Sequence, residues 1–173
     1  GGEKGGVGKS LVARTLAQHL IDHNLPFIGF DTDRSHGALL RFYGDFAAPM
    51  PLDAHDSLDR VIEAAAADPE RRVLVDMAAQ TQASLTQWLQ DAGVPEVAAE
   101  IGVKLSYWHV MDSGRDSVDL LARWLDGPGA ALPMVLVLNE LRGERFELLE
   151  SSGLLARVQA QGTPVLRLRK LPD

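Results

Sequence analysis

Gly2-Glu3-Lys4-Gly5-Gly6-Val7-Gly8-Lys9-Ser10 is the stretch that decides the fold. Its glycines leave the backbone free to take positive φ and to approach a ligand closely. Successive N–H groups can then face one concavity that suits an anion. Apolar residues recur at helical spacing over residues 11–21, which places the loop at a helix N-terminus. The stretch therefore predicts a phosphate site, in which Lys9 reaches the β- and γ-phosphates and Ser10 ligates Mg²⁺.

One position departs from the general P-loop pattern G-x-x-x-x-G-K-[ST], because Glu3 stands at its first glycine. The tighter pattern K-G-G-x-G-K-[ST] fits throughout and resembles the deviant Walker A box of the ParA/MinD family of ATPases. The resemblance implies that Lys4 reaches across a nucleotide-sandwich homodimer to the partner's phosphates. It implies nucleotide contacts from Gly5, Gly6, Val7, Gly8, Lys9, Ser10 and Leu11. The alternative is a glycine-rich turn with two incidental lysines.

Length and composition bound the class of protein. The 173 residues, 46% hydrophobic and 24% charged, predict a single globular domain over 1–173. Zero cysteines exclude disulfides, thiol catalysis and zinc–thiolate sites. The net charge, 17 − 24 = −7, argues against a surface that binds nucleic acid everywhere. A cluster near the end is either a solvated face or a contact for DNA or an acidic partner: Arg157, Arg167, Arg169 and Lys170.

The sequence shows no apolar run of about 18 residues and no signal peptide, so we expect no membrane segment and a cytoplasmic protein. A hydrophobic strand should precede a P-loop, and none precedes Gly1. We therefore expect the family's first strand and a C-terminal tail to lie outside these residues.

Two aspartates follow the first apolar run. Residues 26–33 have the composition of a strand buried on both faces, and ligands of open α/β sheets bind at the carboxyl ends of strands. On a continuing strand Asp31 and Asp33 would share one face. The resemblance implies that Asp33 positions the attacking water and the metal shell. Residues 34–37 depart from the family's usual continuation, and the alternative is a pair of solvated turn aspartates.

Two later strands also end in polar residues. The run 71–76 has Walker B form, and its closing Asp76 would hold Mg²⁺ through water. The run 133–139 ends in Asn139, which by resemblance reads the adenine through its amide, although a simple turn residue is the alternative. The resemblance also places Pro172, in the last loop, against the adenine.

The remaining segments complete an alternation of strands and helices. We expect helices over about 9–24, 56–67, 84–92 and 144–161, the last interrupted at 151–153, and an irregular loop packed on the domain over 38–56. Further strands are expected over 103–111, with a buried and hydrogen-bonded His109, and over 163–168. Ser113 or Asp116 would cap a helix that reaches Leu125. The pattern predicts an α/β, three-layer P-loop NTPase fold, with a mainly parallel sheet flanked by helices on both faces.

The leading hypothesis is an ATPase that binds ATP and Mg²⁺ and hydrolyses slowly, as a dimerisation switch in plasmid or DNA partition, positioning or conjugal transfer. Residues 73–114 resemble the conjugal-transfer TraL-like branch more than the partition or membrane-cycling branches. DNA or a protein activator of hydrolysis would be a further partner. One alternative is an adaptor that uses ATP only to dimerise. Another is a metabolic ligase or reductase, of which zero cysteines exclude the iron–sulfur reductases.

Overall fold

The computed structural model describes residues 5–34, 37–52 and 56–170. Its strands are β1 (Phe27–Asp31), β2 (Ala47–Pro49), β3 (Arg72–Asp76), β4 (Tyr107–Met111), β5 (Met134–Asn139) and β6 (Val165–Leu168). Its α-helices are α1 (Lys9–Asp22), α2 (Ala38–Phe42), α3 (Asp56–Ala67), α4 (Gln82–Asp91), α5 (Val94–Glu100), α6 (Arg115–Asp126), α7 (Glu147–Ser151) and α8 (Leu154–Ala160). Two 3₁₀ turns, η1 (Pro128–Ala131) and η2 (Glu140–Arg142), flank β5.

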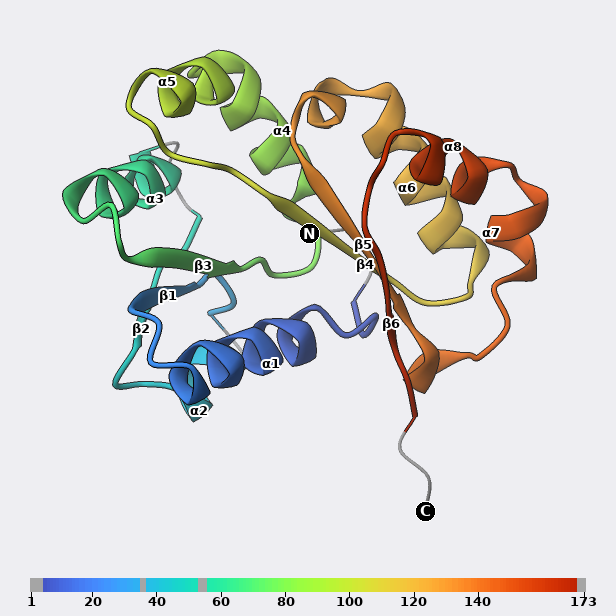
Figure 1. Ribbon diagram of the computed structural model, residues 1–173, viewed down its shortest axis with the longest axis horizontal. Helices are drawn as coiled ribbons and strands as arrows, with labels where there is room; N and C mark the ends of the chain where they lie inside the picture. Colours follow the sequence, from blue (N-terminus) through green and yellow to red (C-terminus); the bar gives the residue numbers. More distant parts are fainter. Residues whose placement is uncertain (1–4, 35–36, 53–55, 171–173) are drawn as a thin grey trace.

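The strands form two parallel three-stranded sheets, in the orders β2-β1-β3 and β4-β5-β6. Asp31 pairs in register with Asp76 in the first sheet, and Met111 pairs with Leu138 in the second. Helices lie on both sides of these sheets (Figure 1). The expected α/β class with parallel strands and flanking helices is confirmed.

A gap separates the two sheets where the edge strands β3 and β4 face each other (Figure 1). It holds a cavity of about 660 Å³, lined mainly by apolar side chains of α1, α3, β3 and β4. Within the described ranges, no ladder joins β3 to β4. The sequence predicted one mainly parallel sheet, whereas the structure has two halves of three strands each.

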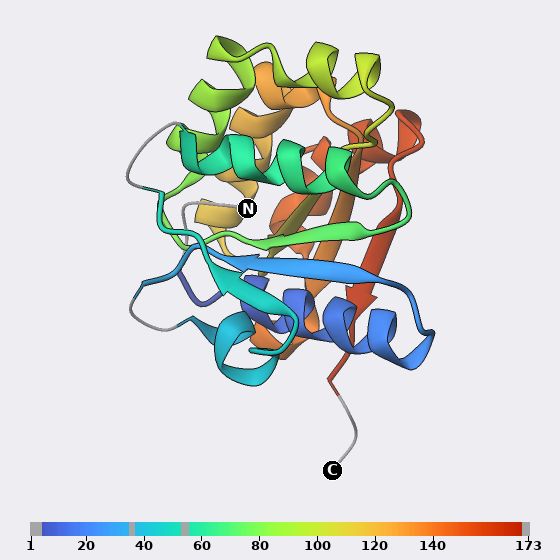
Figure 2. The ribbon, with the colours of Figure 1, turned by 90° about the vertical axis from the view of Figure 1, so that its left-hand side faces the viewer.

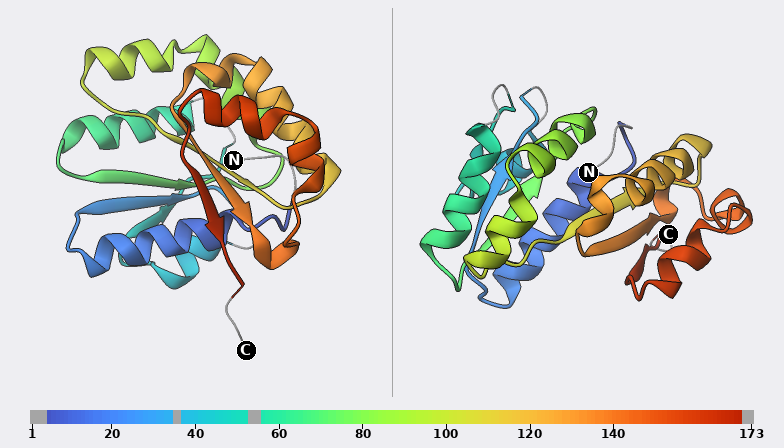
Figure 3. Two further views of the ribbon diagram at one scale, coloured as in Figure 1. Left: turned by 45° about the vertical axis from the view of Figure 1, so that its right-hand side comes forward. Right: turned by 90° about the horizontal axis from the view of Figure 1, so that it is seen from above.

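Helix α1 covers one face of both halves. Val12 packs against Val110 and Val137 of the second sheet, while Ala17 packs against Phe27 of the first. Figure 2 shows the first sheet between α3 on one side and α1 with α2 on the other. Figure 3 shows α1 extending from there towards the second sheet. The helix therefore ties the two sheets together.

Two backbone hydrogen bonds close the C-terminus of α1. Asn24 takes φ +52, and the amides of Asn24 and Leu25 donate to the carbonyls of Ile21 and Leu20. These two bonds form a Schellman motif, which satisfies the last carbonyls of a helix. The helix itself ends at Asp22, two residues short of the expected range over about 9–24.

Helices α6, α7 and α8 cover the other face of the second sheet. Trp124 of α6 is 2% exposed and stacks on Tyr107 of β4, with ring centroids 3.6 Å apart. Leu149 and Val158 complete the same core from α7 and α8. The predicted interruption of the last helical region is confirmed, because Gly153 takes φ +77 between α7 and α8.

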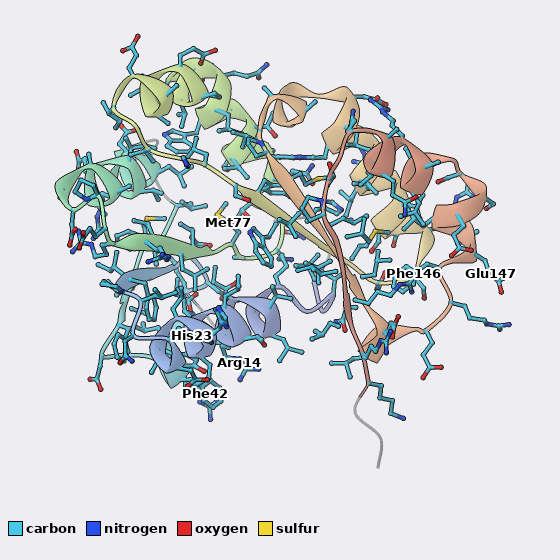
Figure 4. All side chains as sticks on the ribbon, in the orientation of Figure 1. Arg14, His23, Phe42, Met77, Phe146 and Glu147 are labelled. Carbon is cyan, nitrogen blue, oxygen red and sulfur yellow. The ribbon has the colours of Figure 1, made fainter. Side chains whose placement is uncertain are left out.

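The prediction for 38–56 was wrong in part. The segment contains α2 and the short strand β2, which pairs in parallel with β1. The sequence Ala47-Ala48-Pro49 has no β-branched residue, so its intrinsic strand propensity is low. It forms a strand because it pairs with β1. Phe42 is 59% exposed rather than packed inward, and Arg14 lies over its ring at 4.6 Å (Figure 4).

One further expectation was wrong. Gly114 is the N-terminal cap residue of α6 and no side chain caps the helix there; Asp112 instead accepts from the amide of Gly114 and the hydroxyl of Ser117. In the basic cluster near the end of the chain, Arg157 pairs with Asp126 at 2.7 Å and Arg167 with Glu140 at 2.9 Å, and both arginine side chains stay partly exposed.

Among the described residues, no helix combines the length and the apolar character needed to cross a bilayer.

Candidate functional site

The loop over residues 5–8 leads directly into α1. Gly6 has φ +79 and Gly8, the residue before the helix, has φ +104. Both values lie in the left-handed region that favours glycine. The Gly8 carbonyl accepts the first helical bond, from Val12 at 3.0 Å, and no side chain caps the helix there. The loop therefore faces the N-terminus of α1, the positive end of the helix dipole, which favours an anion.

Asn139, at the end of β5, holds this loop in place. Its Nδ2 donates to the carbonyl oxygen of Val7 at 2.8 Å, and its Oδ1 accepts from the amide of Leu141 at 3.1 Å. The side chain is 1% exposed. A Cβ on Gly8 would collide with the same amide group, so the loop and Asn139 fit only with glycine there. The adenine contact that the resemblance implies for Asn139 would use the second N–H and the second oxygen lone pair of this amide, beside its bonds to Val7 and Leu141.

Ser10 and Asp76 meet on the other side of the loop. The Ser10 hydroxyl is hydrogen-bonded to the Asp76 carboxylate, which is 4% exposed. The pKa of Asp76 is raised to about 6, chiefly by burial and also by the negative charge of Asp31, while Ser10 and Lys9 act in the opposite direction. The structure thus brings Lys9, Ser10 and Asp76 together, as the sequence predicted.

Asp31 has a structural role at the end of β1. Its two carboxylate oxygens accept from the amides of Asp33 and Leu40, each at 3.0 Å. The strand ends at Asp31, so the expectation that Asp31 and Asp33 share one strand face was wrong. Asp33 lies two residues beyond the strand and is half-buried.

Thr32 joins the ends of β1 and β3, a role that sequence reasoning missed. Its amide and hydroxyl both donate to the Asp76 carbonyl, at 3.0 and 3.1 Å, and the hydroxyl accepts from the Ala78 amide at 2.7 Å. Nothing in the sequence near Thr32 signals this contact, because both partners lie more than forty residues further along the chain. Asp76 is therefore fixed from its backbone as well as from Ser10.

The loop after Asp76 runs beside the glycine loop. A Cβ on Gly5 would lie 3.9 Å from the Ala79 side chain. Gln80 takes φ +63, a conformation uncommon for a residue other than glycine. The Thr81 hydroxyl donates to the Ala78 carbonyl at 2.8 Å, which tightens the turn before α4.

His109, on β4, is buried as expected but is not hydrogen-bonded through Nδ1 within the described part of the chain. Burial lowers its pKa to about 3, and the positive charge of Lys9 contributes in the same direction. The imidazole is therefore neutral at physiological pH.

The remaining predicted residues divide into two groups. Leu11 lies in the first turn of α1 and is half-buried. Lys4 and Pro172 lie outside the described residues, as do the proposed dimer contact and adenine contact that depend on them.

The donors present fit a hard divalent cation. Ser10 supplies a hydroxyl oxygen and Asp76 a carboxylate, and Mg²⁺ commonly takes one or two protein ligands with waters and phosphate oxygens. Over residues 5–34, 37–52 and 56–170, no group of three or more histidine or acidic side chains is placed to hold a metal by itself. This donor set suits a cation that arrives with a phosphate rather than a protein-only metal site.

No family model matches the chain. The sequence is 26% identical over 165 residues to Protein MobD of Acidithiobacillus ferrooxidans, an alignment that covers 94% of this chain and 72% of MobD.

Proposed function

We propose that the protein is a nucleotide-dependent switch that binds Mg·ATP at the loop over residues 5–10 and hydrolyses it slowly. The observation that carries the proposal is the meeting of three groups at one helix N-terminus: the left-handed glycines before α1, Lys9, and the Ser10–Asp76 hydrogen bond. Phosphoryl transfer needs chiefly positioning and charge neutralisation, which such a site provides.

Each residue would act on a defined part of the ligand. The amides of the loop and of the first turn of α1 would bind phosphate oxygens, and Lys9 would neutralise their charge. Ser10 and Asp76 would hold Mg²⁺, which supplies charge stabilisation at the phosphates when bound. Asp33 would orient the attacking water. Lys4 of a second subunit would complete the site in a homodimer.

We also propose the finer fold, a three-layer P-loop domain in which a further parallel strand occupies the gap between β3 and β4. Val7 contacts the end of β5 and Ser10 contacts the end of β3. The loop therefore spans the gap at the edge where both sheets have their carboxyl ends, and a strand leading into the loop would run parallel to both neighbours. In a chain that carries such a strand, the amide protons of β3 and β4 should exchange more slowly than in residues 1–173 alone.

The process that the switch serves is proposed as plasmid mobilisation or conjugal transfer. Its support is the similarity to Protein MobD, together with the resemblance of residues 73–114 to the TraL-like branch. DNA or a protein activator would be the further partner.

The test is single-turnover phosphate release from Mg·ATP, with light scattering in ATP, in ADP and without nucleotide. We expect slow release that is lost in Lys9→Ala and Asp33→Ala but retained in Lys104→Ala, a variant of an exposed lysine outside the site. An ATP-dependent increase in mass without release would favour the adaptor alternative. No change in mass and no release would contradict the switch.

A further inference from the structure

Two residues other than glycine have a positive φ in the described part of the chain: Asn24 at +52 and Gln80 at +63. Asparagine tolerates this left-handed conformation better than most residues, because its short polar side chain can hydrogen-bond locally. The conformation of Asn24 also has a structural reason, since its amide bond closes the C-terminus of α1. Gln80 has a longer side chain and lies in the loop between β3 and α4. Its backbone conformation is therefore unfavourable and requires another explanation.

The neighbours of Gln80 hold it in this conformation. The Ala78 amide donates to the Thr32 hydroxyl at 2.7 Å, and the Ala78 carbonyl accepts from the Thr81 hydroxyl at 2.8 Å. The first bond fixes the loop to the end of β1, and the second closes the turn over residues 78–81, which contains Gln80. Backbone strain that the surrounding structure maintains in this way is concentrated at functional sites.

The turn over residues 78–81 lies beside the proposed phosphate site. A Cβ on Gly5 would be 3.9 Å from the Ala79 side chain, so the glycine loop is one neighbour of the turn. The other neighbour is the end of β1, where Thr32 directly precedes Asp33. The side chain of Gln80 is exposed, so a ligand at the glycine loop can reach it.

We propose that Gln80 is a catalytic residue that contacts both the terminal phosphate and the attacking water, an inference that rests on the proposed function. A primary amide suits this place because it both donates and accepts hydrogen bonds. Its NH₂ group donates to an oxygen of the terminal phosphate, and its carbonyl oxygen accepts from the water. Together with Asp33, which lies on another loop, Gln80 holds the water in position for attack.

The reaction that Gln80 assists is hydrolysis of the terminal phosphate. The water oxygen bonds to the terminal phosphorus, and the bond between this phosphorus and the bridging oxygen breaks towards ADP. The proton of the water leaves with the released phosphate. Because such a transition state depends chiefly on positioning, loss of the Gln80 amide should slow the reaction without preventing nucleotide binding.

The test is single-turnover phosphate release at saturating Mg·ATP, with ATP affinity and melting temperature measured on the same variants. We expect Gln80→Gly to release phosphate roughly tenfold more slowly or less, with unchanged ATP affinity. Its melting temperature should be unchanged or higher, because glycine takes a positive φ without strain. Gln80→Glu keeps the length of the side chain but loses the donor, and it should be slowed as strongly. Asn24→Gly changes the other residue with positive φ and is the matched control, which should release phosphate at the original rate.

Three results would overturn this inference alone. The first is release by Gln80→Gly at the original rate. The second is weaker ATP affinity with an unchanged rate at saturation, which would make Gln80 a binding residue. The third is equal slowing in Asn24→Gly. If Gln80→Gly does not fold, the rate of Gln80→Glu decides in the same way. Absence of phosphate release from the original chain would instead overturn the proposed hydrolysis, and this inference with it.

Discussion

The side-chain amide of Asn139 donates to the carbonyl oxygen of Val7, 132 residues earlier in the chain, at 2.8 Å. This bond joins the end of β5 to the glycine loop, and the Oδ1 of the same amide accepts from Leu141. The loop is therefore held on the second sheet by a buried polar contact. On the first sheet it is held by the hydrogen bond between Ser10 and Asp76.

Asn139→Ala should lower the free energy of unfolding by about 2 kcal/mol, because the Val7 carbonyl and the Leu141 amide lose their partner at a buried site. It should also weaken ATP binding, since the loop is no longer fixed. Urea denaturation and calorimetric titration with Mg·ATP measure the two effects. Gln159→Ala, on the exposed side of α8, is the control and should change neither. A variant of Asn139 with unchanged stability would show that the bond contributes nothing.

Gly8→Ala should be more damaging than replacement of another left-handed glycine. Gly102 has φ +76 with no atom within 4 Å of an added Cβ, so Gly102→Ala reports the backbone cost alone, about 1 kcal/mol. In Gly8→Ala the added Cβ also collides with Asn139. We expect Gly8→Ala to lose at least twice as much unfolding free energy as Gly102→Ala. Only Gly8→Ala should lose nucleotide binding. Equal losses in the two variants would contradict the fit between Gly8 and Asn139.

Asp76→Asn should affect the stability of the ligand-free protein and the binding of Mg·ATP in different ways. The pKa of Asp76 is raised to about 6, so the ionised carboxylate destabilises the folded state at pH 7.5, and stability falls as pH rises from the unfolded value of 3.8 through 6. The neutral amide can still accept from Ser10. We expect an unfolding free energy without ligand that is equal or higher by about 1 kcal/mol.

The stabilisation of Asp76→Asn by Mg·ATP should be much weaker than that of the original chain. Thermal denaturation with and without Mg·ATP measures both quantities. Lower stability without ligand, combined with full stabilisation by Mg·ATP, would contradict the role given to Asp76.

His109 should make the protein sensitive to acid. Its pKa is lowered from 6.5 to about 3 in the folded state, so between these values the unfolded chain binds a proton that the folded chain does not. Stability is therefore fully present above pH 6.5 and should be lost at about 1.4 kcal/mol per pH unit below it. Denaturation at a series of pH values should show this slope, and His109→Phe should reduce it. An unchanged slope in His109→Phe would contradict this role of His109.

Thr32→Val should loosen the loop after Asp76. The change keeps the shape of the side chain but removes the hydroxyl that donates to the Asp76 carbonyl and accepts from Ala78. We expect a loss of about 1–3 kcal/mol in unfolding free energy and faster amide exchange at Ala78. Thr15→Val, whose hydroxyl bonds only within α1, is the control. Unchanged exchange at Ala78 would contradict the role of Thr32.

Much of the site's placement was predictable because polar residues directly follow apolar runs that have the composition of buried strands. The runs before Asp76 and Asn139 are apolar and end in a polar residue, so the sequence could place both residues at the carboxyl ends of strands, which the structure confirms in two separate sheets. The glycine spacing in residues 5–8 likewise predicted a loop with left-handed residues, confirmed at Gly6 and Gly8.

Other contacts were beyond sequence reasoning because they join distant residues or depend on neighbours. The partner of Asn139 is a backbone carbonyl, which no residue type signals. Strand β2 forms because β1 offers it an edge, and Arg157 and Arg167 are neutralised by acids that lie elsewhere in the sequence. The turn at Asp31 likewise depends on its bond to Leu40, nine residues later.

Calorimetric titration of the protein with ATP, in Mg²⁺ and again in excess EDTA, tests the central claim most directly. The account predicts saturable binding of one ATP per chain in Mg²⁺, weaker binding in EDTA, and no binding in Lys9→Ala when that variant keeps the original melting temperature. Absence of binding to the original chain in Mg²⁺, or equal binding by Lys9→Ala, would contradict the account.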